Sequence, residues 1–176
     1  MTKGGLYHHA VSTAIVSEQI AKLTGRAAPD VAYTAGLLHD IGKVHLDQYV
    51  SAAAPMFYCE VYEEGRDLLA VEKSLLGITH IEAGMRLAEL WSFPPSLTDA
   101  IANHGHPELA QHDKTLAHVI HLADLLILRF APGHEIEMLS TDGLEKRLQP
   151  LGLDKNSLLE LIAGLPWKML GTPGFF

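Results

Sequence analysis

Apolar residues recur every three or four positions along most of this 176-residue chain, and no stretch of useful length alternates apolar with polar residues. This spacing places the apolar side chains on one face of an α-helix, which must pack against other helices. The pattern predicts helices over residues 6–24, 29–41, 67–76, 79–91, 94–104, 115–130, 142–150 and 155–164. Residues 42–54 give an ambiguous pattern, and Pro55 predicts the start of a further helix. We therefore expect an all-α fold, a compact helical bundle.

The length and composition bound the domain organisation. Hydrophobic residues make up 48% and charged residues 19% of the chain, which is typical of a globular domain. At 176 residues we expect a single domain over residues 1–176, with a core at roughly 6–130 and C-terminal helices at 131–170.

The charge and the single cysteine exclude several classes of protein. A formal net charge of −8 argues against binding to nucleic acid or to an anionic lipid surface. The only cysteine, Cys59, excludes an internal disulfide framework and a CxxC metal site. The sequence has no membrane span and no signal peptide, so we expect a soluble, cytoplasmic protein.

Histidine is unusually frequent, with 11 residues dispersed along the chain, and this favours a polar site. The pair His39-Asp40 follows the apolar end of a predicted helix, where an unpaired charge is costly. Near a helix end both side chains can reach one ion, and an imidazole with a carboxylate suits Mn, Fe, Co, Ni or Zn. The alternative is a surface dipeptide beside a helix-ending glycine.

A second polar group interrupts the predicted helix 115–130. His118, His121 and Asp124 lie three residues apart and form a polar stripe on a helix otherwise rich in leucine, isoleucine and valine. Asp124 is either a core carboxylate satisfied by other protein groups or a metal ligand, and the helix alone does not decide between them.

Three further histidines occupy comparable places. His9 lies within the first helix, His80 follows the capping residue Thr79, and His104 ends the helix after the double proline. Taken singly, each is better explained as an exposed or hydrogen-bonded histidine than as a ligand. However, packing these helices together would bring their polar groups into the bundle interior, where helical proteins build metal sites.

The order of these groups resembles the HD superfamily of metal-dependent phosphohydrolases and, within it, the HDOD subgroup. The resemblance covers roughly residues 6–130. Its motifs are AGLLHDIGK at 35–43, LGITHIEAG at 76–84, WSFP at 91–94 followed by AIANH at 100–104, and HLAD at 121–124.

The resemblance implies a set of site residues. The positions that match ligands of a primary metal are His9, His39, Asp40 and Asp124, and those that match ligands of a second metal are His80 and His104. It also implies that Asp40 bridges the ions when a second is present and that Lys43 meets substrate phosphate. Glu72 and His121 are expected to orient a ligand or a bound water.

The sequence departs from this family in three places. Dinuclear members carry paired histidines after the double-proline helix, whereas Gly105 follows His104 here; His106 is a candidate substitute. The extended signature of the HD-GYP branch, which acts on cyclic dinucleotides, is missing. Members of the HDOD subgroup also carry a helical segment upstream of the first histidine helix, so we expect either a fragment or a shortened member.

Two functions are compatible with these features. The first is hydrolysis of a small phosphorylated molecule, a nucleotide or phosphodiester, by water activated on one or two divalent ions, with Asp40 and Lys43 as catalytic residues. The second is a non-catalytic signalling domain that holds a structural metal and recruits a protein partner. A third reading makes all the histidines core filler. We also expect that the apolar tail 167–176 could support a homodimer.

Overall fold

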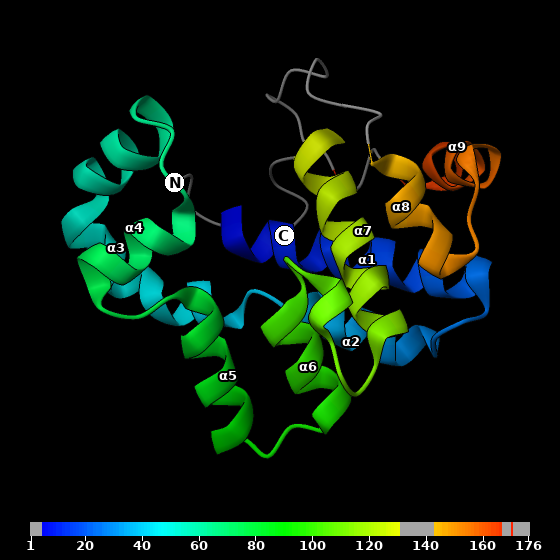
Figure 1. Cartoon of the computed structure of the whole chain (residues 1–176), viewed down its shortest axis with the longest axis horizontal. Coiled ribbons are helices and arrows are strands. Elements are labelled where there is room, and N and C mark those ends of the chain that lie inside the picture. The colour runs from blue at the N-terminus through cyan, green and yellow to red at the C-terminus, as the bar shows by residue number, and fades with distance from the viewer. Residues whose placement is uncertain (1–4, 131–142, 167–169, 171–176) are drawn as a thin grey trace.

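Helices account for most of the computed structural model, which describes residues 5–130, 143–166 and 170. Within these ranges no strand occurs, so the expected all-α fold is confirmed (Figure 1). The helices are α1 (Gly5–Thr24), α2 (Pro29–Leu38), α3 (Ile41–Tyr58), α4 (Leu68–Leu76), α5 (His80–Leu90), α6 (Pro95–Asn103), α7 (Lys114–Phe130), α8 (Leu144–Leu148) and α9 (Lys155–Gly164). Single turns follow three of these helices: a π-helical turn at Cys59–Glu63 and 3₁₀ turns at Pro107–Leu109 and Gln149–Leu151.

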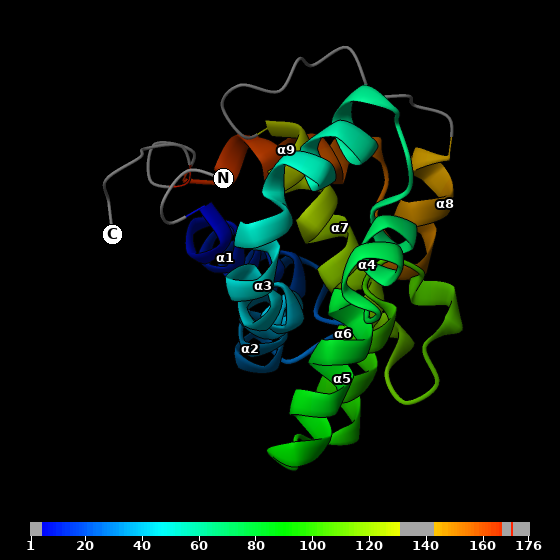
Figure 2. The ribbon, with the colours of Figure 1, turned by 90° about the vertical axis from the view of Figure 1, so that its left-hand side faces the viewer.

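The core lies where α1, α2 and α7 meet. Val16 and Ile20 of α1 and Leu116 and Ile120 of α7 are fully buried against one another, and buried leucines of α8 and α9 extend the same cluster. In Figure 1, α3 and α4 lie on one side of α1 and α7, and α8 and α9 lie on the other. Figure 2 shows α5 and α6 side by side at the lower end of the molecule. This packing places the start of α3, the start of α5 and the end of α6 close to α1 and α7.

Local sequence signals place the helix that carries His80. The hydroxyl of Thr79 accepts a hydrogen bond from the amide of Glu82, and the Glu82 carboxylate accepts one from the amide of Thr79. This reciprocal pair satisfies two backbone donors at the start of α5, as the sequence predicts. Gly77 ends α4 with a φ of 75°, a conformation that glycine adopts without steric cost.

Two predictions about the middle of the chain are wrong. Helix α2 ends at Leu38, and His39-Asp40 forms a turn before α3 begins at Ile41. Pro55 does not start a helix but lies inside α3, which covers most of the ambiguous segment. Pro55 lies in the last turn of α3, and both Pro55 and Met56 are exposed, so the proline costs one backbone hydrogen bond at the end of the helix without preventing it.

The C-terminal expectations are only partly accessible. Helices α8 and α9 lie within the predicted segment 131–170, but residues 131–142 and 167–169 fall outside the described residues. The apolar tail 167–176, expected to support a homodimer, also falls outside the described residues, apart from residue 170. None of the helices in the described ranges is long and apolar enough to span a bilayer.

Glycine allows α3 and α5 to approach closely at their first turns. A Cβ atom on Gly42 would overlap the carbonyl oxygen of His80 and would lie 2.8 Å from the amide nitrogen of Gly84. Both neighbours are backbone atoms of a helix, so neither can move aside alone. Gly42 therefore sets the distance between the turn that carries Asp40 and the helix that carries His80.

We expect Gly42→Ala to lower the free energy of unfolding by about 2 kcal/mol or more, because the methyl group forces the two helices apart. Urea denaturation followed by circular dichroism measures this change. The control is Gly164→Ala at the end of α9, where an added Cβ meets nothing within 4 Å. Equal stabilities for the two variants would show that α3 and α5 can separate without cost.

Candidate metal centre

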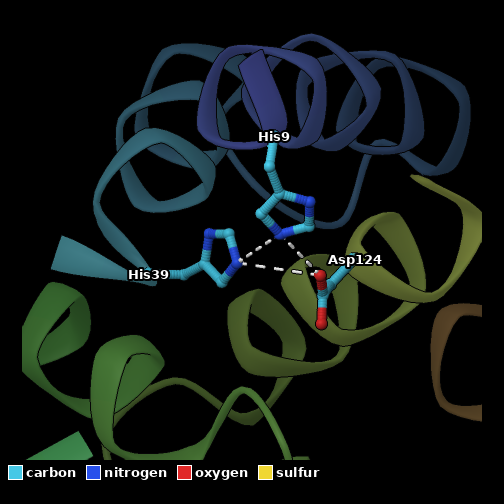
Figure 3. Close-up of side chains that lie close together, drawn as sticks. All are labelled: His9, His39 and Asp124. Atoms are coloured by element: carbon cyan, nitrogen blue, oxygen red, sulfur yellow. Dashed lines mark hydrogen bonds and ion pairs between the residues drawn. The ribbon is translucent and has the colours of Figure 1, made fainter. Parts of the chain in front are cut away.

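Six of the predicted side chains converge in two adjoining groups of potential ligands. The first group contains His9 of α1, His39 of the turn after α2, and Asp124 of α7 (Figure 3). The second contains Asp40, the neighbour of His39, together with His80 at the start of α5 and His104 at the end of α6. Within each group the potential ligand atoms lie within 4.8 Å of one another.

The first group is compact. Nε2 of His9 lies 3.0 Å from Oδ1 of Asp124 and 3.3 Å from Nε2 of His39, as the dashed lines in Figure 3 mark. The third side of this triangle, from Nε2 of His39 to Oδ1 of Asp124, is 3.7 Å. The three atoms come from three different helical segments and face one point, as the ligands of a single ion must.

Asp40 lies between the two groups. Its Oδ2 is 3.4 Å from Nε2 of His39 and 3.6 Å from Nε2 of His9. Its Oδ1 is 3.6 Å from Nε2 of His104 and 3.8 Å from Nε2 of His80. The residue is only 4% exposed, and within the described part of the chain this Oδ1 has no hydrogen-bond partner. A buried carboxylate oxygen without a hydrogen bond is costly, and a cation beside it would remove that cost.

The histidines present acceptor atoms to this carboxylate. Nδ1 of His39 lies 2.7 Å from the carbonyl oxygen of Gly36, and Nδ1 of His104 lies 2.9 Å from that of Ile101. A carbonyl oxygen only accepts hydrogen bonds, so Nδ1 carries the proton in both rings. When these rings are neutral, Nε2 carries no proton, and its lone pair faces the carboxylate oxygens. Neutral imidazoles and carboxylates around one buried point are a donor set that fits a divalent transition ion.

The charges of the centre act strongly on one another. Burial tends to lower the pKa of His39, but the carboxylates of Asp40 and Asp124 outweigh it and raise that pKa to about 10. Burial tends to raise the pKa of Asp40, yet the charges of His39 and Lys43 hold it well below its usual range. His104 shifts the other way: burial and the nearby His39 charge lower its pKa to about 4. Without an ion, the centre therefore compensates its carboxylates with a proton on His39.

Three other predicted residues touch these ligand candidates. Nζ of Lys43 lies 2.7 Å from Oδ2 of Asp40. The buried carboxylate of Glu72 accepts hydrogen bonds from the backbone amide of His80 at 2.8 Å and from its Nδ1 at 2.7 Å. Nδ1 of His121 donates to the carbonyl oxygen of His104 at 2.8 Å.

The structure does not bring two of the singled-out histidines into either group. The side chain of His106 is 70% exposed, and its Nδ1 lies 3.4 Å from Oε1 of Glu108. His118, the first residue of the stripe on α7, is also absent from both groups.

Sequence reasoning missed one buried acid near the centre. Asp99 of α6 is 7% exposed, and its carboxylate accepts hydrogen bonds from backbone amides of residues 111–113. Its position among the apolar residues Leu97, Ala100 and Ile101 was the available signal, because an acid on a buried helix face must be paired.

The raised pKa of His39 generates a prediction for the chain treated with a chelator. A protonated His39 stabilises the folded state fully below its ordinary pKa of 6.5, and this contribution is lost as the pH rises toward about 10. We therefore expect the free energy of unfolding to fall by about 2 to 4 kcal/mol between about pH 7 and pH 10. Urea titrations at several pH values measure it. His39→Gln should flatten the profile and the exposed His45→Gln should keep it; a flat profile in the unsubstituted chain would contradict the expectation.

Comparisons with known proteins agree on the family and the helical fold of this chain. The HDOD domain family matches residues 1–107. A candidate phosphohydrolase from Shewanella amazonensis is 26% identical with a TM-score of 0.75, over 97% of this chain and 62% of that one. An HDOD domain protein with unknown function from Geobacter sulfurreducens is 26% identical with a TM-score of 0.67, over 97% of this chain and 60% of that one.

A curated relative is matched over a smaller share of its length. Ribonuclease Y of Deinococcus radiodurans is 30% identical over 141 residues, which are 77% of this chain and 19% of the relative. The chain thus spans about three fifths of the two solved proteins and about a fifth of Ribonuclease Y. Since the family match extends over more than half of the sequence and the helical fold agrees with it, the chain belongs to the HDOD family of the HD superfamily.

Proposed function

We propose that this chain is a metal-dependent phosphohydrolase that cleaves a nucleotide or a phosphodiester with water. The observation that carries the proposal is the position of Asp40, a buried carboxylate with one set of potential ligands near each of its oxygens. Among the residues that the structure describes, none forms a hydrogen bond with its Oδ1. That arrangement is suited to a carboxylate that bridges two ions.

The two groups define which residues would hold which ion. His9, His39 and Asp124 would hold the first, and His80 and His104 would hold the second. Asp40 would contribute one oxygen to each. The mixture of imidazole and carboxylate favours Mn, Fe, Co, Ni or Zn over calcium or magnesium.

A bound ion would supply a water of lowered pKa and would neutralise charge on the phosphoryl oxygens. The residues of the chain prepare the centre for this role. Glu72 accepts a hydrogen bond from Nδ1 of His80. This bond keeps the proton on Nδ1, so that Nε2 of the ring is available as a ligand and is more basic. Lys43, whose side chain is partly exposed beside Asp40, places a positive charge where a phosphoryl oxygen can reach it.

The relatives narrow the substrate class without naming a substrate. Both a phosphohydrolase and a ribonuclease cleave phosphoester bonds, which supports the reaction type. For this chain, RNA is less favoured than a small nucleotide, because the chain's net charge of −8 opposes association with a polyanion.

A second candidate function is a regulatory HDOD domain that holds a structural ion and recruits a protein partner. The observation in its favour is Gly105, which follows His104 and offers no side-chain ligand, while the next residue, His106, is paired with Glu108 instead. A second ion that binds weakly would impair a reaction that needs two ions.

Asp40→Asn tests the catalytic proposal directly. We expect it to reduce hydrolysis by at least about a hundredfold, because the amide removes the charge that both groups share. The assay uses the metal-loaded chain with nucleotides, cyclic dinucleotides, a chromogenic phosphodiester and a short RNA. Asp47→Asn, at an exposed position of α3, the helix that follows Asp40, should retain activity. Absence of turnover across the panel, or an active Asp40→Asn variant, would overturn the proposal.

Elemental analysis separates the two functions at an earlier stage. We expect about two equivalents of transition metal in the chain purified without an affinity tag, falling when His80 and His104 are both replaced by alanine. If the ion is structural, its removal should lower the melting temperature sharply while no substrate is turned over. A chain that neither carries nor takes up metal would contradict both readings of the centre.

A further inference from the structure

The geometry points to Asp99 as a positioning residue that fixes His104 relative to Asp124 by anchoring the loop between α6 and α7. This inference rests on the proposed function only in taking those two residues as metal ligands. Asp99 itself belongs to neither ligand group. It acts through the backbone of residues 105–113, which connects the end of α6 to the start of α7.

One oxygen of Asp99 accepts hydrogen bonds from the last three residues of this loop. Oδ2 accepts hydrogen bonds from the backbone amides of Gln111 at 2.9 Å, His112 at 2.7 Å and Asp113 at 3.1 Å. Three donors converging on one oxygen require a negatively charged acceptor, and a charged acceptor strengthens each bond. These amides immediately precede α7, so the carboxylate fixes the point at which that helix starts.

The other oxygen of Asp99 forms a hydrogen bond within the last turn of α6. Oδ1 accepts a hydrogen bond from Nδ2 of Asn103 at 2.8 Å. The carbonyl oxygen of Asn103 in turn accepts from the amide of His106 at 3.0 Å. Asp99 therefore joins the last turn of α6 directly to the residues that lead into α7.

The consequence for the metal centre follows from what each end carries. His104 directly follows α6, and Asp113 caps α7 by accepting a hydrogen bond from the amide of Leu116 at 2.9 Å. About two turns into α7, His121 donates to the carbonyl oxygen of His104, and Asp124 follows on the same side of the helix. If the start of α7 shifted, it would carry Asp124 with it and would strain the contact between His121 and His104.

The middle of the loop is held by the buried residues Pro107 and Ala110, but the segment just after His104 is open. An added Cβ on Gly105 would meet nothing within 4 Å, so the backbone just after His104 has room to move. His106, the next residue, is exposed. Asp99 adds to these contacts by fixing residues 111–113, the part of the loop that leads into α7.

Asp99→Asn tests this role, because the amide keeps the shape of the side chain but loses its charge and turns an NH₂ group toward backbone donors or leaves Asn103 unpaired. The matched control is Asp154→Asn. Asp154 also accepts a backbone amide, that of Ser157 at 2.8 Å, but it caps α9, which contributes no residue to the two ligand groups. Circular dichroism and urea denaturation identify conditions in which both variants are folded.

The first measurement is Co²⁺ binding, by calorimetry and by the visible absorption of the bound ion. We expect Asp99→Asn to weaken the binding of at least one ion by about tenfold and to change its absorption spectrum. Asp154→Asn should leave affinity and spectrum unchanged even where it costs equal stability. If the folded Asp99→Asn chain binds Co²⁺ with unchanged affinity and spectrum, the inference is overturned.

The second measurement needs no metal and separates this inference from the proposed function. In the chelator-treated chain, we expect Asp99→Asn to speed amide exchange at residues 111–113 by about tenfold and to shift the imidazole nitrogen resonances of His104 and His121. Unchanged exchange and resonances would overturn the inference, whereas a chain that binds no Co²⁺ would overturn only the proposed function. If Asp99→Asn does not fold, Asn103→Ala takes its place. We then expect smaller changes in amide exchange and in the two histidine resonances, and unchanged values would again overturn the inference.

Discussion

The mutual placement of Asp40 and Asp124 is the constraint on which the rest of the centre depends. Both carboxylates lie where imidazole rings have turned their Nε2 atoms inward, so the region needs a positive charge that its own neutral side chains do not provide. Metal-free, that charge is a proton on His39 together with the ammonium group of Lys43. An ion would replace the proton, because a protonated Nε2 cannot be a ligand. Stability and metal affinity are therefore coupled through the same ring.

The way in which the helices meet explains why two neighbouring residues serve two groups. His39 and Asp40 form a turn between α2 and α3, and they do not continue a helix. His39 is held by the carbonyl of Gly36 behind it and belongs with the first group, while Asp40 faces α5 and α6 with one oxygen. The close approach at Gly42 keeps that second oxygen near His80. One carboxylate thereby lies between ligands supplied by helices that are far apart in sequence.

Much of the fold was accessible from sequence because its signals are local. The capping box at Thr79 and the helix-ending Gly77 act through neighbours within a few residues, and both predicted helix ends are confirmed. Pro55 misled the prediction because a proline penalises a helix without preventing one at an exposed position. The ligand candidates could be named only from their order along the chain and the family it resembles. The apolar neighbours of Asp99 signal that it is buried, but its partners could not be predicted, since they are backbone amides 12 to 14 residues away and amides carry no sequence signature.

The balance of charge indicates which feature separates an enzyme from a regulatory domain in this chain. One divalent ion and Lys43 together offset the carboxylates of Asp40, Asp124 and Glu72, which leaves no surplus charge to attract a phosphate. A second divalent ion would make the centre positive, and an anionic substrate would then be drawn to it despite the acidic surface. Occupancy of the group formed by Asp40, His80 and His104 is therefore decisive. His104 directly follows α6, and Asp99 anchors the end of the loop after it. If His104 holds a second ion, as we propose, the rigidity of that loop would influence the affinity for this ion and hence catalysis.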